Sequence, residues 1–203
     1  PERRKLHPEP YFRQNLLLSK DLSIFYGDRC VANGISLTLN RGDRIALVGR
    51  NGCGKSSLLK LLIGQPIAHT GTLEIGSRLT VSYVPQDMSF LSGSADDFAA
   101  ESEIDITLFK TILRKLDFKR TQFTKDMSEF SMGQKKKVLL ARSLCQRANL
   151  YIWDEPLNYI DVISRLQIET LILEYKPTML FVEHDEAFVN DIATKVCRIS
   201  LNQ

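Results

Sequence analysis

The run of residues 49–56 carries the spacing G-x-x-x-x-G-K-S, with Gly49, Gly54, Lys55 and Ser56 at the defining positions. An apolar segment that favours a strand precedes it at residues 45–48, and one that favours a helix follows at residues 57–62. Glycines let the backbone curl so that several N–H groups point at one anion, and the following helix adds the positive end of its dipole. The lysine suits the β- and γ-phosphates, and the hydroxyl suits Mg²⁺. The sequence therefore predicts binding of a nucleoside triphosphate.

All of this loop is expected to contact the nucleotide. The expected contacts come from Gly49, Arg50, Asn51, Gly52, Cys53, Gly54, Lys55, Ser56 and Ser57. A glycine-rich turn before a core helix is the alternative, but strand, loop and helix agree with a phosphate loop. Cys53 lies at a helix N-terminus, a setting that makes thiols reactive, so we expect its alkylation to block ATP binding. The alternative for Cys53 is a small residue that fills space.

A second apolar segment, residues 150–153, ends in two carboxylates, Asp154 and Glu155. Strands of a parallel sheet deliver polar residues at its carboxyl edge, where ligands bind in open α/β folds. We expect Asp154 to bind Mg²⁺ together with Ser56, and Glu155 to act as general base for a water that attacks the γ-phosphate. The alternative is that these residues only begin a helix, with Pro156 in its first turn.

Residues 131–144 favour a long helix that Ser131 caps. One interpretation is a capped amphipathic helix and nothing more. The other is a second anion-binding helix N-terminus, aimed at a phosphate that this chain's own loop does not hold. Three consecutive lysines follow at positions 135, 136 and 137. We expect them to lie on a solvated helix face, and contact with RNA phosphates is the alternative.

The elements that must position these residues alternate between strands and helices. Further strands are predicted at residues 16–25, 35–39, 178–182 and 196–201, a hairpin at residues 72–75 and 80–84, a loop at 85–100, and helices at 104–118, 161–175 and 185–192. This alternation favours an α/β fold with a mixed or largely parallel sheet. The helical stretch from about residue 89 to residue 147 interrupts it and is expected to form a small helical subdomain. Residues 1–13 are rich in proline and charge and are expected to be a linker tail before an ATP-binding domain at 14–203.

Bulk composition narrows the class of protein. The 203 residues carry a net charge of only +3, so nucleic-acid binding cannot be argued from charge alone. The four cysteines are scattered without a C-x-x-C pair, which argues against a zinc site and favours a reducing compartment such as the cytoplasm. No apolar run is long enough to predict a transmembrane segment.

The order of the motifs resembles an ATP-binding-cassette (ABC) nucleotide-binding domain, a P-loop ATPase with an antiparallel β-subdomain and a helical subdomain. The signature of that family is normally Leu-Ser-Gly-Gly-Gln, and here residues 130–134 read Phe-Ser-Met-Gly-Gln. The resemblance implies that Ser131, Met132, Gly133 and Gln134 contact a nucleotide on a partner cassette. Met132 replaces the usual first glycine, so the backbone approaches the γ-phosphate less closely there.

The resemblance also implies roles for four separate residues. Tyr26 is expected to stack on adenine, Gln86 to link Mg²⁺ and the attacking water, Asp161 to belong to the D-loop, and His184 to contact the γ-phosphate. Lys55, Gln86, Glu155 and His184 would then form the catalytic set. Ser56, Gln86 and Asp154 would form the metal set.

Residues 155–161 resemble the Glu-Pro-Thr-Asn-His-Leu-Asp segment of the ABC-F class, and the signature region looks like the C-terminal cassette of Lsa-like antibiotic-resistance members. That class carries two cassettes in one chain and acts on the ribosome, so the resemblance implies antibiotic resistance by ribosome protection. The implied cofactors are ATP and Mg²⁺. The implied partners are a second cassette and ribosomal RNA, the latter reached through a linker that this chain lacks.

Two other functions remain open. The chain could be the ATPase subunit of an ABC membrane transporter, which would use the same residues to handle ATP. It could also be a nucleotide-gated clamp without activity, although intact Lys55, Asp154, Glu155 and His184 argue against that.

Overall fold

The computed structural model describes residues 14–200, which form two sheets. The first sheet is antiparallel, with the order β2-β1-β4, and contains β1 (Asn15–Tyr26), β2 (Arg29–Asn40) and β4 (Ala68–Ile75). The second sheet is parallel, with the order β5-β6-β7-β3-β8, and contains β3 (Arg44–Val48), β5 (Val81–Val84), β6 (Leu150–Asp154), β7 (Met179–Val182) and β8 (Lys195–Arg198). The expected α/β fold with a parallel core and an antiparallel subdomain is therefore confirmed.

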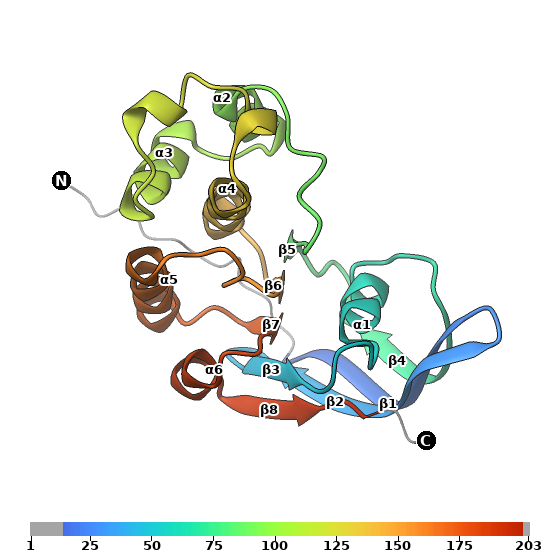
Figure 1. The fold of residues 1–203 in the computed structure, drawn as a ribbon. Helices are drawn as coiled ribbons and strands as arrows, with labels where there is room; N and C mark the ends of the chain where they lie inside the picture. Colours follow the sequence, from blue (N-terminus) through green and yellow to red (C-terminus); the bar gives the residue numbers. More distant parts are fainter. Residues whose placement is uncertain (1–13, 201–203) are drawn as a thin grey trace.

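The helices cover both faces of the parallel sheet. They are α1 (Lys55–Leu62), α2 (Ala95–Glu101), α3 (Ile106–Lys115), α4 (Met132–Cys145), α5 (Val162–Tyr175) and α6 (Glu186–Ile192), with short 3-10 turns at Arg120–Gln122 and Met127–Glu129. Figure 1 shows α1 on the side that faces β4, α5 and α6 on the opposite side, and α2, α3 and α4 gathered beyond β5.

Side chains of the parallel strands alternate between two hydrophobic clusters. Along β6, Trp153 packs into the cluster that contains α2 to α6, whereas Ile152 packs into the cluster that contains α1 and the antiparallel sheet. Phe181 and Leu180 divide in the same way on β7. Because side chains of a strand point alternately to its two faces, an all-apolar strand needs cover on both faces. This double cover leaves the strand ends as the places where polar residues can meet.

The expected hairpin at residues 72–84 is wrong. β4 pairs with β1 of the antiparallel sheet, and β5 pairs with β6 of the parallel sheet. The turn around Gly76 therefore moves the chain from one sheet to the other. The expected loop at residues 85–100 also needs correction at its end, because α2 begins at Ala95 with Ser94 as its cap.

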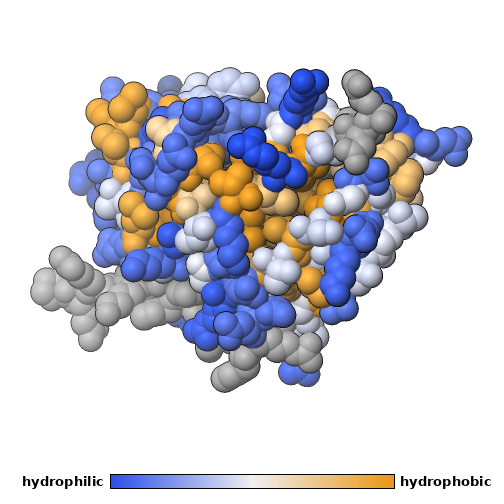
Figure 2. All heavy atoms as spheres, turned by 90° about the horizontal axis from the view of Figure 1, so that it is seen from below, coloured by the Kyte–Doolittle hydropathy of each residue, from blue (hydrophilic) through white to orange (hydrophobic). Residues whose placement is uncertain are grey.

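The underside of the molecule carries an apolar centre. Figure 2 views this face from below and shows hydrophobic atoms gathered in its middle with hydrophilic atoms around them. A groove of about 380 Å³ lies between β2 and β8, and Leu37, Ile45 and Val196 are among its lining residues. Within residues 14–200, no helix is long and apolar enough to cross a membrane. The predicted linker tail at residues 1–13 lies outside the described residues.

Candidate nucleotide-binding site

Four loops meet at one edge of the parallel sheet. They follow β3, β5, β6 and β7. These four parallel strands are neighbours in the sheet, in the order β5-β6-β7-β3, which differs from their order along the chain. The loop after β3 is the predicted phosphate loop, and the other three carry Gln86, Glu155 and His184. Parallel pairing is what brings these segments of distant sequence to the same edge.

The N-terminus of α1 is open in a way that the other helix N-termini are not. Its first residue follows Gly54, which has a φ of 86° and supplies no side-chain cap. Among the α-helices of residues 14–200, each of the others begins with a side chain that accepts a backbone N–H, namely Ser94, Asp105, Ser131, Asp161 and Asp185. Uncapped N–H groups at a helix start are available to an anion.

Only glycine fits at position 54. A Cβ there would lie 2.6 Å from both the Ala32 Cβ and the Val31 carbonyl oxygen. The positive φ would strain any other residue as well. Gly54 thus lets the phosphate loop pack closely against β2 while it turns into α1.

The Lys55 side chain hydrogen-bonds to the backbone of its own phosphate loop. Its side chain is 6% exposed, and its Nζ donates hydrogen bonds to the Gly49 and Arg50 carbonyl oxygens at 2.8 and 3.0 Å. The ammonium therefore holds the loop in a curled shape around a point where phosphate oxygens can replace the carbonyls. Cys53 is 3% exposed, with its Sγ 3.9 Å from Lys55 Nζ, so it fills space within the loop. The expected effect of its alkylation stays a prediction.

Asp154 has the properties of a metal ligand. It is 1% exposed, the Ser56 hydroxyl hydrogen-bonds to it, and its Oδ1 is buried without a hydrogen-bond partner within the described part of the chain. Burial raises the pKa of Asp154, and the hydrogen bond from Ser56 opposes that effect. A buried carboxylate oxygen without a partner is costly unless a cation or donor meets it. Asp154 and Ser56 together fit an oxygen-liganded Mg²⁺.

Glu155 lies at the centre of the polar groups. Its Oε2 accepts hydrogen bonds from Gln86 Nε2 at 2.8 Å and from Asn158 Nδ2 at 2.5 Å, and its Oε1 lies 3.4 Å from His184 Nε2. The structure thus brings together three of the residues expected in the catalytic set. Gln86 contacts Glu155 and not Asp154, so its predicted role as a metal ligand stays a prediction.

Glu183 is a functional candidate that sequence reasoning missed. It is 5% exposed, its Oε1 accepts the His184 N–H at 2.8 Å, and its Oε2 accepts the Leu157 N–H at 3.1 Å. One carboxylate thereby ties the loop after β7 to the loop after β6. The signal was present, because Glu183 is an acidic residue at the end of an apolar strand, as Asp154 is.

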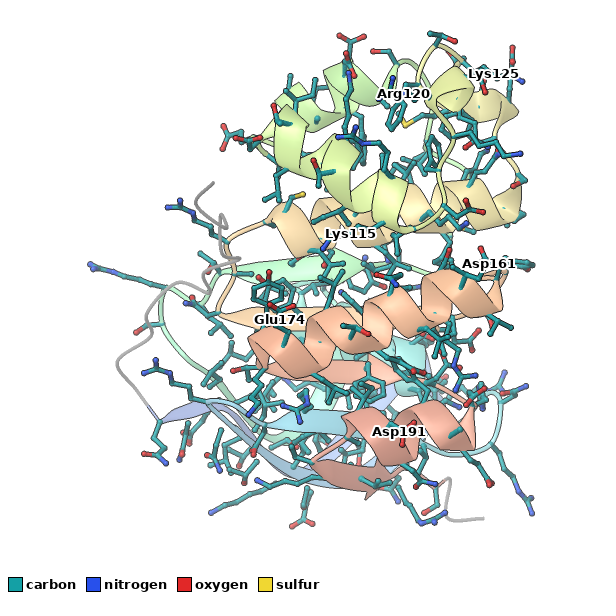
Figure 3. The ribbon with its side chains drawn as sticks, turned by 90° about the vertical axis from the view of Figure 1, so that its left-hand side faces the viewer. Lys115, Arg120, Lys125, Asp161, Glu174 and Asp191 are labelled. Carbon is teal, nitrogen blue, oxygen red and sulfur yellow. The ribbon has the colours of Figure 1, made fainter. Side chains whose placement is uncertain are left out.

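The predicted signature segment begins α4 and packs against the loop before α5. Ser131 Oγ accepts the Gln134 N–H at 3.2 Å, and Gln134 Oε1 accepts the Ser131 N–H at 2.9 Å, which is a capping box. A Cβ on Gly133 would lie 2.6 Å from the Tyr159 carbonyl oxygen. Lys137 Nζ lies 2.6 Å from Asp161 Oδ2, and Figure 3 shows Asp161 at the end of α5 that faces α4.

The predicted solvated face at Lys135, Lys136 and Lys137 is wrong for two of the three. Lys136 is 1% exposed and Lys137 is 8% exposed, whereas Lys135 is half-buried. A charge run does not reveal burial, because the helix turns by 100° per residue and its inner face is covered by β5 and the loop before α5. Buried ammonium groups cannot reach RNA phosphates, so the alternative fails for Lys136 and Lys137 as well.

Tyr26 lies at the end of β1 and is 48% exposed. An exposed aromatic ring is available for stacking on a base, and its role with adenine stays a prediction. Met132 is also exposed, at 46%, on the first turn of α4.

Comparison with known proteins shows which family the chain resembles. The family described as "ABC transporter" matches residues 32–158. The chain is 31% identical over 185 residues to the ATP-binding protein Uup of Caulobacter vibrioides and 29% identical over 192 residues to ABC transporter F family member 2 of Arabidopsis thaliana. These matches cover 87% and 92% of this chain but only 30% and 28% of the relatives, so the chain spans less than a third of their length.

Solved structures resemble the fold at lower identity. A structure of the ATP-binding subunit of an ABC transporter has a TM-score of 0.76 at 22% identity, and covers 92% of this chain and 88% of that one. A bacterial Atm1-family ABC exporter with ATP bound has a TM-score of 0.80 at 19% identity, and covers 96% of this chain and 39% of that one. At these identities the likeness shows the fold alone.

Proposed function

Because the chain belongs to the ABC transporter family, we propose that it is a cassette that binds and hydrolyses ATP as one half of a two-cassette pair. The observation that carries the proposal is the position of Glu155 between Gln86, Asn158 and His184, at the sheet edge that also carries the phosphate loop. A base for water, a donor to the phosphate and a phosphate cradle are what phosphoryl transfer requires.

Each residue has a distinct task in this proposal. The uncapped N–H groups of α1 and the Lys55 ammonium bind the β- and γ-phosphates. Glu155 accepts a proton from the attacking water, and His184 and Gln86 hold the γ-phosphate and the water in line. Asp154 and Ser56 would hold Mg²⁺, which when bound supplies positive charge to the phosphate oxygens.

A second cassette is needed because the signature segment serves another nucleotide. Within residues 14–200, Ser131 and Gln134 hydrogen-bond to each other, and Gly133 packs on Tyr159. These contacts place the start of α4 beside the loop before α5. Because residues 130–134 resemble the ABC signature, we infer that a nucleotide in this chain's phosphate loop takes its signature contact from a partner cassette.

The class that this proposal favours is ABC-F. The relatives named Uup and ABC transporter F family member 2 support that class, as does the residue pattern at positions 155–161. We extend the proposal to action on the ribosome, with protection against antibiotics as its outcome. The wider likeness to transporter subunits lies below 25% identity and favours no transporter role.

Serial dilution tests the paired mechanism. Phosphate release per mole of the full-length protein encoded with this chain, and of the 203-residue chain, is measured with Mg-ATP. The specific activity of the short chain should fall on dilution to nanomolar protein, because two copies must meet, whereas two cassettes in one chain should keep theirs. A short chain whose specific activity stays constant would contradict the pair.

Cosedimentation tests the proposed action on the ribosome. The full-length protein with Glu155→Gln, which should retain ATP, is centrifuged with ribosomes in the presence of ATP or ADP. We expect ATP-dependent pelleting. No pelleting with either nucleotide would refute action on the ribosome, and equal pelleting with both would refute its dependence on ATP. Neither outcome bears on ATP hydrolysis.

A further inference from the structure

Lys136 is a buried charge that the proposed mechanism does not use. It lies on the second turn of α4 and is 1% exposed. Lysine is almost never fully buried unless its charge is compensated. Its compensation comes from the nucleotide-binding edge and not from its own helix.

The hydrogen bond of Lys136 crosses to another element. Its Nζ donates to the Pro85 carbonyl oxygen at 3.4 Å, immediately before Gln86, which in turn donates to Glu155 at 2.8 Å. Lys136 therefore supports the turn that presents Gln86.

Three carboxylates interact electrostatically with this charge. Burial lowers the pKa of Lys136, while the charges of Asp154, Glu155 and Glu183 raise it. In the proposed site, Asp154 would hold the metal and Glu155 would activate the water. Glu183 links the loops after β6 and β7. Lys136 thus brings, from α4, a positive charge that these three carboxylates attract.

The first turns of α4 also contact the loop before α5. Gly133 packs on Tyr159, and Lys137 pairs with Asp161 at 2.6 Å. Lys136 adds a third contact, to the Pro85 carbonyl oxygen in the turn after β5. The helix that carries the signature is thereby joined to the chain's own catalytic edge.

We propose that Lys136 is a positioning residue that joins the signature helix to the Pro85–Gln86 turn and offsets the negative charge of Asp154, Glu155 and Glu183. Its charge weakens the attraction of the nucleotide-free site for a divalent cation. The part that concerns Gln86 rests on the proposed ATP hydrolysis. The part that concerns charge does not.

Mn²⁺ titration of the nucleotide-free, full-length protein tests the charge. Lys136→Met should bind Mn²⁺ about 3- to 10-fold more tightly, since a buried unit charge that repels the cation is gone. Lys136→Arg keeps the charge and should match the parent. Lys135→Met is the control on the same helix and should change the affinity by less than about twofold, because it removes a more exposed charge.

A second measurement tests the link to Gln86. Lys136→Met should lower kcat for ATP about 10-fold with KM unchanged, since it displaces the turn but leaves Lys55 in place. Lys136→Gln removes the charge but keeps a donor for Pro85, so it should retain more of kcat while showing the same gain in Mn²⁺ affinity. Lys136→Gln also stands in should the methionine variant not fold.

Equal Mn²⁺ affinity in Lys136→Met, Lys136→Gln and the parent would overturn the proposal. So would a gain as large in Lys135→Met. A parent without ATPase activity would refute the proposed function alone, because the Mn²⁺ titration contains no nucleotide.

Discussion

Two helix N-termini of this chain face phosphate in the proposed mechanism, and they are built differently. The start of α1 has no side-chain cap, and its lysine folds onto carbonyls of the same loop. The start of α4 is closed by the Ser131–Gln134 capping box and held by contacts to distant loops. The phosphate loop is thus ready for its ligand, whereas the signature segment must exchange its own hydrogen bonds for those of a partner's nucleotide.

This difference has an energetic side. An N-cap contributes about 1 kcal/mol to stability. A phosphate that displaces the Ser131 cap must therefore offset that amount before it adds affinity. The α1 terminus has no such cost, so binding should begin there and closure on the signature should follow.

The largest predicted effect concerns Glu155. Glu155→Gln keeps the shape of the side chain and removes the base, so turnover should fall roughly 10²- to 10⁴-fold. ATP affinity should stay unchanged, because the phosphate loop is intact. Phosphate release and equilibrium binding of ATP are the two measurements.

Glu174→Gln, on the exposed side of α5, is the matched control for this charge change. Parental turnover in Glu155→Gln would remove Glu155 as the base. The α1 terminus would then hold a nucleotide beside a carboxylate that does not take part in its hydrolysis.

The next effect concerns the open terminus. Lys55→Ala should weaken Mg-ATP about 10- to 150-fold, as expected for loss of a hydrogen bond to a charged group worth about 1.5–3 kcal/mol. Calorimetry measures this affinity, and Lys60→Ala on the same helix is the control. Equal affinities of the two variants would show that α1 binds phosphate without its lysine.

Gly133→Ala tests how closely α4 is held. The new Cβ would lie 2.6 Å from the Tyr159 carbonyl oxygen, which is a backbone atom and must move. The free energy of unfolding should fall by about 1–3 kcal/mol, as for other overpacked sites. Denaturant titration measures it, with Met132→Ala on the exposed side as control. A stability loss no larger than that of the control would mean that the loop before α5 moves away from the new Cβ without a measurable cost in free energy.

The smallest effect is the acid dependence of the Lys137–Asp161 pair. Burial would raise the pKa of Asp161, but hydrogen bonds from Lys137 and Ser164 outweigh it and lower that pKa from 3.8 to about 2. Because the folded pKa is depressed, the stabilisation is complete above pH 3.8 and is lost as pH falls through about 2.

Thermal melting between about pH 4 and pH 2 checks this sign. The midpoint of Asp161→Asn should depend less on pH in that window than the midpoint of the parent. Parallel curves would indicate that the pair does not hold α4 in solution.

The sequence predicts the phosphate loop well because its geometry is local. Gly54 and Lys55 act within a few residues of their neighbours, and the Ser131–Gln134 box spans one turn. The carboxylates at the end of β6 were also predictable, since an apolar strand must end where its polar residues begin.

Long-range packing explains what the sequence did not reveal. The segments on either side of Gly76 look like a hairpin, but each finds its partner strand far away in the chain. Lys136 and Lys137 look solvated until β5 and the loop before α5 cover them. The role of Glu183 depends on Leu157, from a different strand end.

The bare start of α1 makes nucleotide a stabilising ligand for the fold itself. No side chain caps its first amides, and a bound anion would accept hydrogen bonds from them, so the native chain should resist heating better with ATP than alone. At a free concentration one hundred times the dissociation constant, mass action adds about 2.7 kcal/mol to the free energy of unfolding. A cell that is short of ATP would thus hold this cassette in its most heat-sensitive form.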